Sequence, residues 1–104
     1  MNKHGAPSVL LMEHAALAVI EEVPKNSRVL ILVGSGKNGG DAVAAGRLLL
    51  SKGEVCDFMT FYQGEGCEEL SLQWELLRSY GFPYEVFELR SGIPDFAKYD
   101  VIID

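Results

Sequence analysis

The chain has 104 residues, of which 48% are hydrophobic, and its nine basic and fifteen acidic residues give a net charge of −6. This size and composition predict a single globular domain with one core, and the acidic balance, without a basic run, argues against a nucleic-acid partner. Because no apolar stretch nears the ~18 residues of a membrane span and no secretory leader opens the chain, we expect a cytoplasmic protein that binds a small molecule and no membrane.

The first predicted element is a helix from Ser8 to Glu22, in which apolar residues recur at helical spacing. Ser8 is its expected N-cap, and Pro24 marks its far end. His14 falls inside this helix. Because a lone His needs a second ligand or an acid partner to do chemistry, we interpret His14 as a solvated or edge side chain.

A continuous apolar run from Arg28 to Val33 predicts the central strand of a sheet, covered on both faces. The strand leads into a glycine turn from Gly34 to Asp41, with the sequence Gly-Ser-Gly-Lys-Asn-Gly-Gly-Asp. Its four glycines let backbone amides approach an anion closely, so the turn predicts an anion-binding site; a tight connection without a ligand is the alternative. A helix is then expected from Asp41 to Ser51, with Asp41 as N-cap or first-turn acid and Gly53 closing it.

The rest of the chain continues the alternation of strands and helices. Small residues at 44–46 predict close packing of the second helix on the sheet, and Trp74 is expected to pack at the edge of the core. Cys56 and Cys67 lack the spacing of a metal or redox pair, so we expect two free, mostly buried thiols. In order, the pattern predicts a strand at 54–62, a helix at 67–80 ended by Gly81, a strand at 84–89, a turn or short helix at 94–98 and a last strand at 99–104.

This alternation predicts an α/β domain with a mainly parallel sheet and right-handed crossovers. In such sheets ligands bind at the carboxyl ends of the strands. The glycine turn and Asp104 both follow predicted strands, so they are expected on one rim of the sheet.

The glycine turn fits two standard nucleotide loops only in part. It matches the GxGxxG spacing of dinucleotide-binding loops, but these also require an acid at the end of the next strand, where residues 60–62 read Thr-Phe-Tyr. A Walker A loop requires Gly-Lys-Ser or Gly-Lys-Thr, which the sequence lacks. The side chains of Lys37, Asn38 and Asp41 suit a phosphorylated or polyhydroxylated ligand, and with Asp104 they could hold a hard cation through oxygen ligands.

Three motifs of the chain resemble the NAD(P)HX epimerase family, also called the YjeF N-terminal domain. The glycine turn with Arg47 is similar to the family's G-x-G-N-N-G-G-D-G-x-x-x-A-R-x-L signature. Residues 11–16, Leu-Met-Glu-His-Ala-Ala, resemble its L-M-E-x-A-G helix, and residues 99–104, Tyr-Asp-Val-Ile-Ile-Asp, its Y-D-hydrophobic-V-D strand. The resemblance implies one domain over residues 1–104, with a Rossmann-like three-layer α/β/α sandwich of which about four strands are present.

The epimerases of this family interconvert the R and S forms of hydrated NADH and NADPH, and so rescue damaged cofactor for a companion dehydratase. Carried over by position, the resemblance implies that the substrate's phosphates are bound by Lys37, Asn38, Gly39, Gly40 and Asp41. It further implies that Asn38 and Asp104 give oxygen ligands to a potassium ion. It assigns no catalytic residue within this chain.

The sequence departs from the family pattern in three respects. Lys37 stands where the family has its first Asn, and Ala16 and Ala42 replace glycines. In the family, the strand that ends here at Asp104 continues into a second Gly-rich loop, further strands and a later Asp for the acid–base work. We therefore expect residues 1–104 to be a domain incomplete at its C-terminus, inactive alone, that forms a homo-oligomer or pairs with a C-terminal half.

Two other functions remain open on the sequence. A non-catalytic nucleotide-binding or dimerisation module is the second hypothesis, because an incomplete sheet leaves an edge at which another chain can pair. An ordinary NAD-dependent oxidoreductase is the weakest, since the ribose-binding acid and a substrate domain are missing from the sequence.

Overall fold

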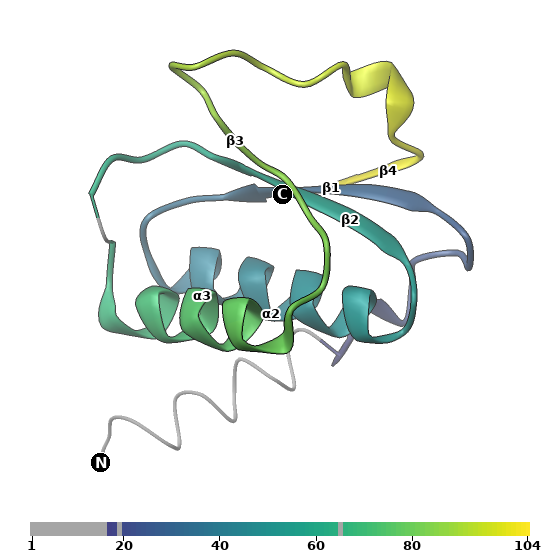
Figure 1. The fold of residues 1–104 in the computed structure, drawn as a ribbon, viewed down its shortest axis with the longest axis horizontal. Helices are drawn as coiled ribbons and strands as arrows, with labels where there is room; N and C mark the ends of the chain where they lie inside the picture. Colours follow the sequence, from purple (N-terminus) through teal and green to yellow (C-terminus); the bar gives the residue numbers. More distant parts are fainter. Residues whose placement is uncertain (1–16, 19, 65) are drawn as a thin grey trace.

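The computed structural model describes residues 17, 18, 20–64 and 66–104, and its four strands form one parallel sheet in the order β3-β2-β1-β4 (Figure 1). The elements follow in chain order as β1 (Arg28–Val33), α2 (Lys37–Ser51), β2 (Val55–Thr60), α3 (Glu68–Tyr80), β3 (Val86–Glu88), a 3-10 helix η1 (Phe96–Lys98) and β4 (Val101–Ile103). The predicted α/β class and parallel sheet are confirmed. The helix predicted at 8–22, with Ser8 and His14, lies largely outside the described residues, as does Ala16.

β1 is an inner strand, as predicted, with β2 on one side and β4 on the other. Its whole length pairs with β2, from Arg28 opposite Val55 to Val33 opposite Thr60. β4 pairs with a shorter part of β1 and ends with Ile103 opposite Ile31. Because all these pairs are parallel, the carboxyl ends of the strands share one rim, from which the chain enters the glycine turn.

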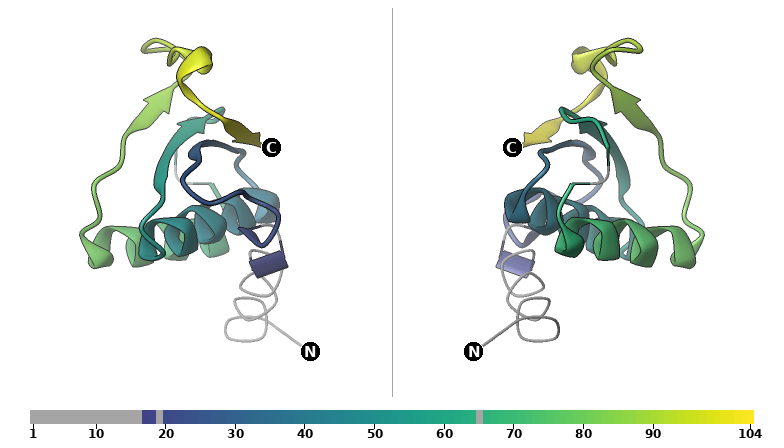
Figure 2. Two further views of the ribbon diagram at one scale, coloured as in Figure 1. Left: turned by 90° about the vertical axis from the view of Figure 1, so that its right-hand side faces the viewer. Right: turned by 90° about the vertical axis from the view of Figure 1, so that its left-hand side faces the viewer.

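Both α2 and α3 pack on one face of the sheet, and the connection from β3 to β4, with η1, lies on the other side (Figures 1 and 2). Small residues allow α2 to approach the sheet. A Cβ atom added at Gly46 would collide with the ring of Phe58 and lie 3.1 Å from the side chain of Ile31. Ala44 and Ala45 are buried as well. The close packing predicted from residues 44–46 is therefore confirmed.

The start of α2 differs from the prediction. The helix begins at Lys37 and not at Asp41, and its N-cap is Gly36. Asp41 is consequently neither the N-cap nor a first-turn acid. Glycine is a poor helix former, so Gly39 and Gly40 read as turn residues in the sequence. At the other end the prediction holds, since Gly53, with φ of 88°, follows the last residues of the helix.

The later elements lie where the sequence predicts them, but the strands β2, β3 and β4 are shorter than predicted. α3 has Cys67 as N-cap and ends at Gly81, which takes a left-handed φ of 73°. Both cysteines are free; Cys56 is buried, and burial raises the pKa of its thiol, whereas Cys67 is only partly buried, contrary to expectation. No helix within the described ranges is long and apolar enough to cross a membrane.

Candidate functional site

The glycine turn lies at the point where the order of strands reverses. From β1 the chain passes through α2 to β2 and then outward to β3, whereas β4 returns to the opposite side of β1. In open α/β sheets such a switch point opens a crevice at the carboxyl ends of the strands, and ligands bind there. The turn leaves β1 at this point, and Asp104 follows the end of β4 next to it.

The turn is tighter than the sequence implied, because only residues 34–36 separate β1 from α2. Gly39 packs directly against Gly34: a Cβ atom at Gly39 would overlap the Gly34 carbonyl oxygen and lie 2.9 Å from its carbonyl carbon. By contrast, a Cβ atom at Gly34 or Gly36 would meet nothing within 4 Å. Gly39 is thus the glycine that this backbone geometry requires.

The backbone amides at the start of α2 divide into two pairs. Those of Gly39 and Gly40 donate to the carbonyl oxygen of Gly36, at 3.0 and 3.3 Å. Those of Lys37 and Asn38 donate to no group in the part of the chain that the structure describes. Open amides combine with the partial positive charge of a helix start to favour an anion. The amides available to a phosphate are therefore those of Lys37 and Asn38, with Gly39 and Gly40 forming the turn behind them.

The connection between β2 and α3 holds the turn in place. Phe61 donates its amide to the carbonyl of Val33 at 3.1 Å, and Cys67 donates to that of Ser35 at 3.0 Å. Gly66, with φ of 74°, leaves so little space that an added Cβ atom would lie 2.9 Å from the same Ser35 oxygen. These contacts tie the end of β1 and the Ser35 carbonyl group of the turn to the connection that leads into α3.

Lys37 reaches toward α3. Its Nζ atom lies 3.6 Å from Oε2 of Glu69, and the Lys37 side chain is 71% exposed. The pKa of Glu69 lies below its ordinary value, first because of a hydrogen bond from its own backbone amide and then because of the charge of Lys37. The Glu69 side chain is 21% exposed, and because solvent screens a lysine as exposed as Lys37, the pair contributes little to stability.

Asp41 lies in the second turn of α2 and is half-buried. Burial raises the pKa of its carboxyl group above the ordinary value. A carboxyl group shifted in this direction takes up a proton more readily than an exposed one.

Asn38 and Asp104 are both exposed; Asn38 lies in the first turn of α2, and Asp104 follows β4, the strand that pairs with β1. Among the described residues, no group of three or more His, Cys, Asp or Glu side chains could hold a metal ion. The two residues offer only oxygen donors of amide and carboxylate type, a chemistry that suits a hard cation such as potassium rather than zinc. The structure thus brings residues 37–41 together on α2 and places Asp104 on the same rim, as the strand polarity predicted.

Two residues of α2 and α3 have contacts that the sequence did not reveal. Arg47, part of the signature, is 5% exposed, and its guanidinium carbon lies 5.5 Å from the centre of the Tyr80 ring. This contact links α2 to α3, so Arg47 has a structural role. Glu69 is the partner of Lys37. The only local signal for Glu69 is its place in the first turn of a helix, and its position beside the glycine turn depends on the tertiary fold.

Comparison with known proteins identifies the family. Residues 8–104 match the family model described as YjeF-related protein N-terminus. The chain is 37% identical to an NAD(P)H-hydrate epimerase of Weissella koreensis and 33% identical to one of Oenococcus oeni, and the matches span all of this chain but 47% and 50% of those proteins. It is also 38% identical to the bifunctional NAD(P)H-hydrate repair enzyme Nnr of Archaeoglobus fulgidus. That match spans 96% of this chain and 20% of the Nnr protein.

The fold is shared with a solved structure. The crystal structure of the yeast protein YNL200c matches 82% of this chain with a TM-score of 0.64 and 26% identity, and the match spans 39% of the yeast chain. The Rossmann-like arrangement implied by the sequence is thereby confirmed. The chain spans about half the length of the epimerases it matches. From the matched region and the shared fold, this chain belongs to the family of YjeF-related N-terminal domains.

Proposed function

We propose that a protein carrying this chain is an NAD(P)HX epimerase, which interconverts the R and S forms of hydrated NADH and NADPH. The observation that carries the proposal is the pair of open amides of Lys37 and Asn38 at the switch point of the sheet. A dinucleotide presents a pyrophosphate, and such amides at a helix start favour that group. Relatives named NAD(P)H-hydrate epimerase support the choice of substrate.

In this proposal the phosphates of the substrate bind to the first turns of α2, through Lys37, Asn38, Gly39, Gly40 and Asp41. Lys37 contributes a positive charge, and the close packing of Gly39 against Gly34 supports the turn from which the open amides of Lys37 and Asn38 project. Asp41 lies on the same segment, and burial raises the pKa of its carboxyl group above the ordinary value. Epimerisation needs a positioned proton donor and acceptor. We assign no catalytic residue in this chain.

A potassium ion is part of the same proposal. Asn38 and Asp104 would supply oxygen ligands, and their donor atoms and shared rim fit that role. A bound cation would offset the negative charge that phosphates and carboxylates gather at this rim. Its test is binding alone: thallium, a spectroscopic substitute for potassium, should bind to the protein and lose affinity in Asp104→Ala.

We further propose that the sheet is extended beyond β4 by a C-terminal half or a second copy of the chain. β4 pairs with β1 on one side only within the described sheet, and Ile102 on it is 46% exposed. An apolar edge strand of this kind favours pairing with a further strand. The relatives supply about twice the length of this chain, which supports a C-terminal half as the partner.

The decisive experiment joins this chain to the remainder of the Weissella koreensis epimerase, in place of the matching region. The hybrid should interconvert the two epimers of hydrated NADH, and Asp104→Ala should abolish that activity. Asp95→Asn is the control, because Asp95 is exposed and accepts a hydrogen bond from Ala97 that Asn can replace. A folded hybrid without activity, as judged by its circular dichroism spectrum, would contradict the proposal. Nucleotide binding without turnover would instead support the non-catalytic module.

A further inference from the structure

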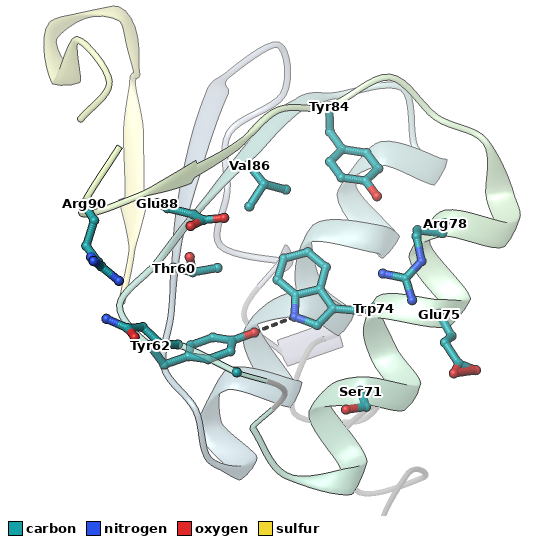
Figure 3. Close-up of a pocket in the computed structure, with 12 residues that line it drawn as sticks. Thr60, Tyr62, Ser71, Trp74, Glu75, Arg78, Tyr84, Val86, Glu88 and Arg90 are labelled. Carbon is teal, nitrogen blue, oxygen red and sulfur yellow. Dashed lines mark hydrogen bonds between the residues drawn. The ribbon is translucent and has the colours of Figure 1, made fainter. Parts of the chain in front are cut away.

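A pocket lies away from the glycine turn, between α3 and the strands β2 and β3 (Figure 3). It is open to solvent and has a volume of about 640 Å³. Cavities that bind small organic molecules have volumes of roughly 300–1,000 Å³. Thr60 and Glu88, the last residues of β2 and β3, both line it, so the pocket opens at the carboxyl rim of the sheet.

Aromatic side chains form one side of this pocket and are held in position. The indole nitrogen of Trp74 donates a hydrogen bond of 2.7 Å to the hydroxyl oxygen of Tyr62. Behind them, the fully buried ring of Phe58 makes edge-to-face contacts with Trp74 and Tyr84, at centroid distances of 5.4 and 5.5 Å. Rings that are fixed before binding can pack on a planar ligand at little cost in conformational entropy.

Charged side chains surround the aromatic part. Arg78 of α3 turns its guanidinium group toward Trp74, and the carboxylate of Glu88 points into the pocket, whereas Glu75 points away from it (Figure 3). Arg90 lines the rim beside Glu88. Within the described residues neither arginine forms an ion pair. The pocket therefore combines aromatic surface, two available guanidinium groups and a carboxylate.

The pocket is separate from the glycine turn. None of its lining residues belongs to the turn at 34–41. The connection after β2 lies between them, since Tyr62 and Gly64 line the pocket while Gly66 and Cys67 contact Ser35 of the turn. A ligand in this pocket consequently meets a different set of side chains from one on the turn.

We propose that this pocket binds a purine ribonucleotide group, an inference that goes beyond the proposed epimerase reaction. The base packs on Trp74 and Tyr84, and the carboxylate of Glu88 accepts hydrogen bonds from the ribose hydroxyl groups. The guanidinium groups of Arg78 and Arg90 bind the phosphate. The same group is present in a free mononucleotide and in the adenosine half of a dinucleotide.

Trp74 is the only tryptophan of the chain, so its fluorescence reports on the pocket directly. Titration with AMP should change the emission and saturate. Arg78→Gln and Arg90→Gln should each lower the affinity for AMP about tenfold, because a charge-assisted hydrogen bond is lost. They should change the affinity for adenosine little. Arg28→Gln is the matched control, because Arg28 is exposed at the amino end of β1 and should leave AMP binding unchanged.

The ribose contact has its own test. Wild-type protein should prefer adenosine to 2′,3′-dideoxyadenosine by about tenfold, and Glu88→Ala should remove that preference. Glu75→Ala, whose carboxylate points out of the pocket, should retain it. Absence of saturable binding of AMP, or equal effects of the Glu88 and Glu75 variants, would overturn the proposal.

A variant of the glycine turn separates this inference from the epimerase proposal. Asn38→Asp places a negative charge beside the open amides and should weaken the binding of a phosphate group at the turn. AMP binding that is lost in Asn38→Asp but kept in the arginine variants would overturn the pocket proposal. If Asn38→Asp and the arginine variants all weaken the binding of NADH, while only the arginine variants weaken the binding of AMP, the pocket binds the adenosine half of a dinucleotide. If neither arginine variant weakens the binding of NADH, the pocket binds a free mononucleotide.

Discussion

The glycine turn and the pocket beside α3 are two candidate binding regions, built in different ways. The turn is made from consecutive residues, and its chemistry is that of backbone amides at a helix start. The pocket is made from side chains of β2, α3 and β3, which are far apart in the sequence. In the turn, Gly39 has no room for a larger side chain whereas Gly34 and Gly36 do, and the pocket should respond mainly to the loss of particular side chains.

The strongest way to test this difference is Gly39→Ala. The added methyl group would overlap the carbonyl of Gly34, so the turn must deform, and we expect a loss of about 3 kcal/mol in the free energy of unfolding. Gly36→Ala is the control, because its Cβ atom meets nothing within 4 Å and should cost at most about 1 kcal/mol. Urea denaturation measures both values; equal losses would show that the turn does not have this geometry.

Gly46→Ala tests whether the two regions share a structural element. The added methyl group would collide with the ring of Phe58, which also contacts Trp74 and Tyr84 in the pocket. We expect a loss of about 2 kcal/mol, with a change in Trp74 emission, because the Phe58 ring must move. Loss of stability with unaltered emission would mean that the pocket does not depend on the packing of α2. Gly53→Ala is unsuitable as a control, since φ there is 88°.

Tyr62→Phe acts on the pocket alone. It removes the hydrogen bond of 2.7 Å to the Trp74 indole and should cost about 1 kcal/mol in the free energy of unfolding, with a shift in Trp74 emission. The stability of the turn depends on backbone contacts, so the amide NMR signals of residues 34–41 should not move. Movement of those signals would connect the regions more tightly than the structure indicates.

The smallest effect is expected for Asp41→Asn, measured across pH. Burial raises the pKa of Asp41 in the folded protein, so its ionised form is destabilising there. The penalty is absent below the pKa of the unfolded chain and is complete above that of the folded protein. Asp41→Asn should therefore be slightly more stable than the wild type at about pH 7, and the difference should disappear near pH 3. A difference that grows on acidification would contradict the direction of the shift.

The sequence was most informative where local patterns determine the structure. β1 has the predicted bounds, Arg28 to Val33, because a buried apolar run leaves little choice of element. The start of α2 was misplaced because Gly39 and Gly40 read as a turn, whereas the close approach of Gly39 to Gly34 places them in the helix. That approach is a contact of the folded backbone, which propensity does not report.

The positions of the candidate site residues divide in the same manner. Residues 37–41 and the common rim with Asp104 could be predicted, because strand polarity and one local motif are sufficient. The partnership of Lys37 with Glu69 could not, nor could the meeting of Tyr62, Trp74 and Tyr84 around one cavity. These contacts depend on how α3 lies against the sheet, and no spacing along the chain encodes it.

The hydrogen bonds that hold the turn also set how fast its amide protons exchange with solvent. The amides of Phe61 and Cys67 are bound to carbonyl oxygens at 3.1 and 3.0 Å, and they exchange only when the connection after β2 opens. The amides of Lys37 and Asn38 are open at the helix start and should exchange rapidly until an anion covers them. Deuterium uptake at these four amides thus separates two events in time: the opening of the turn and the occupation of its site.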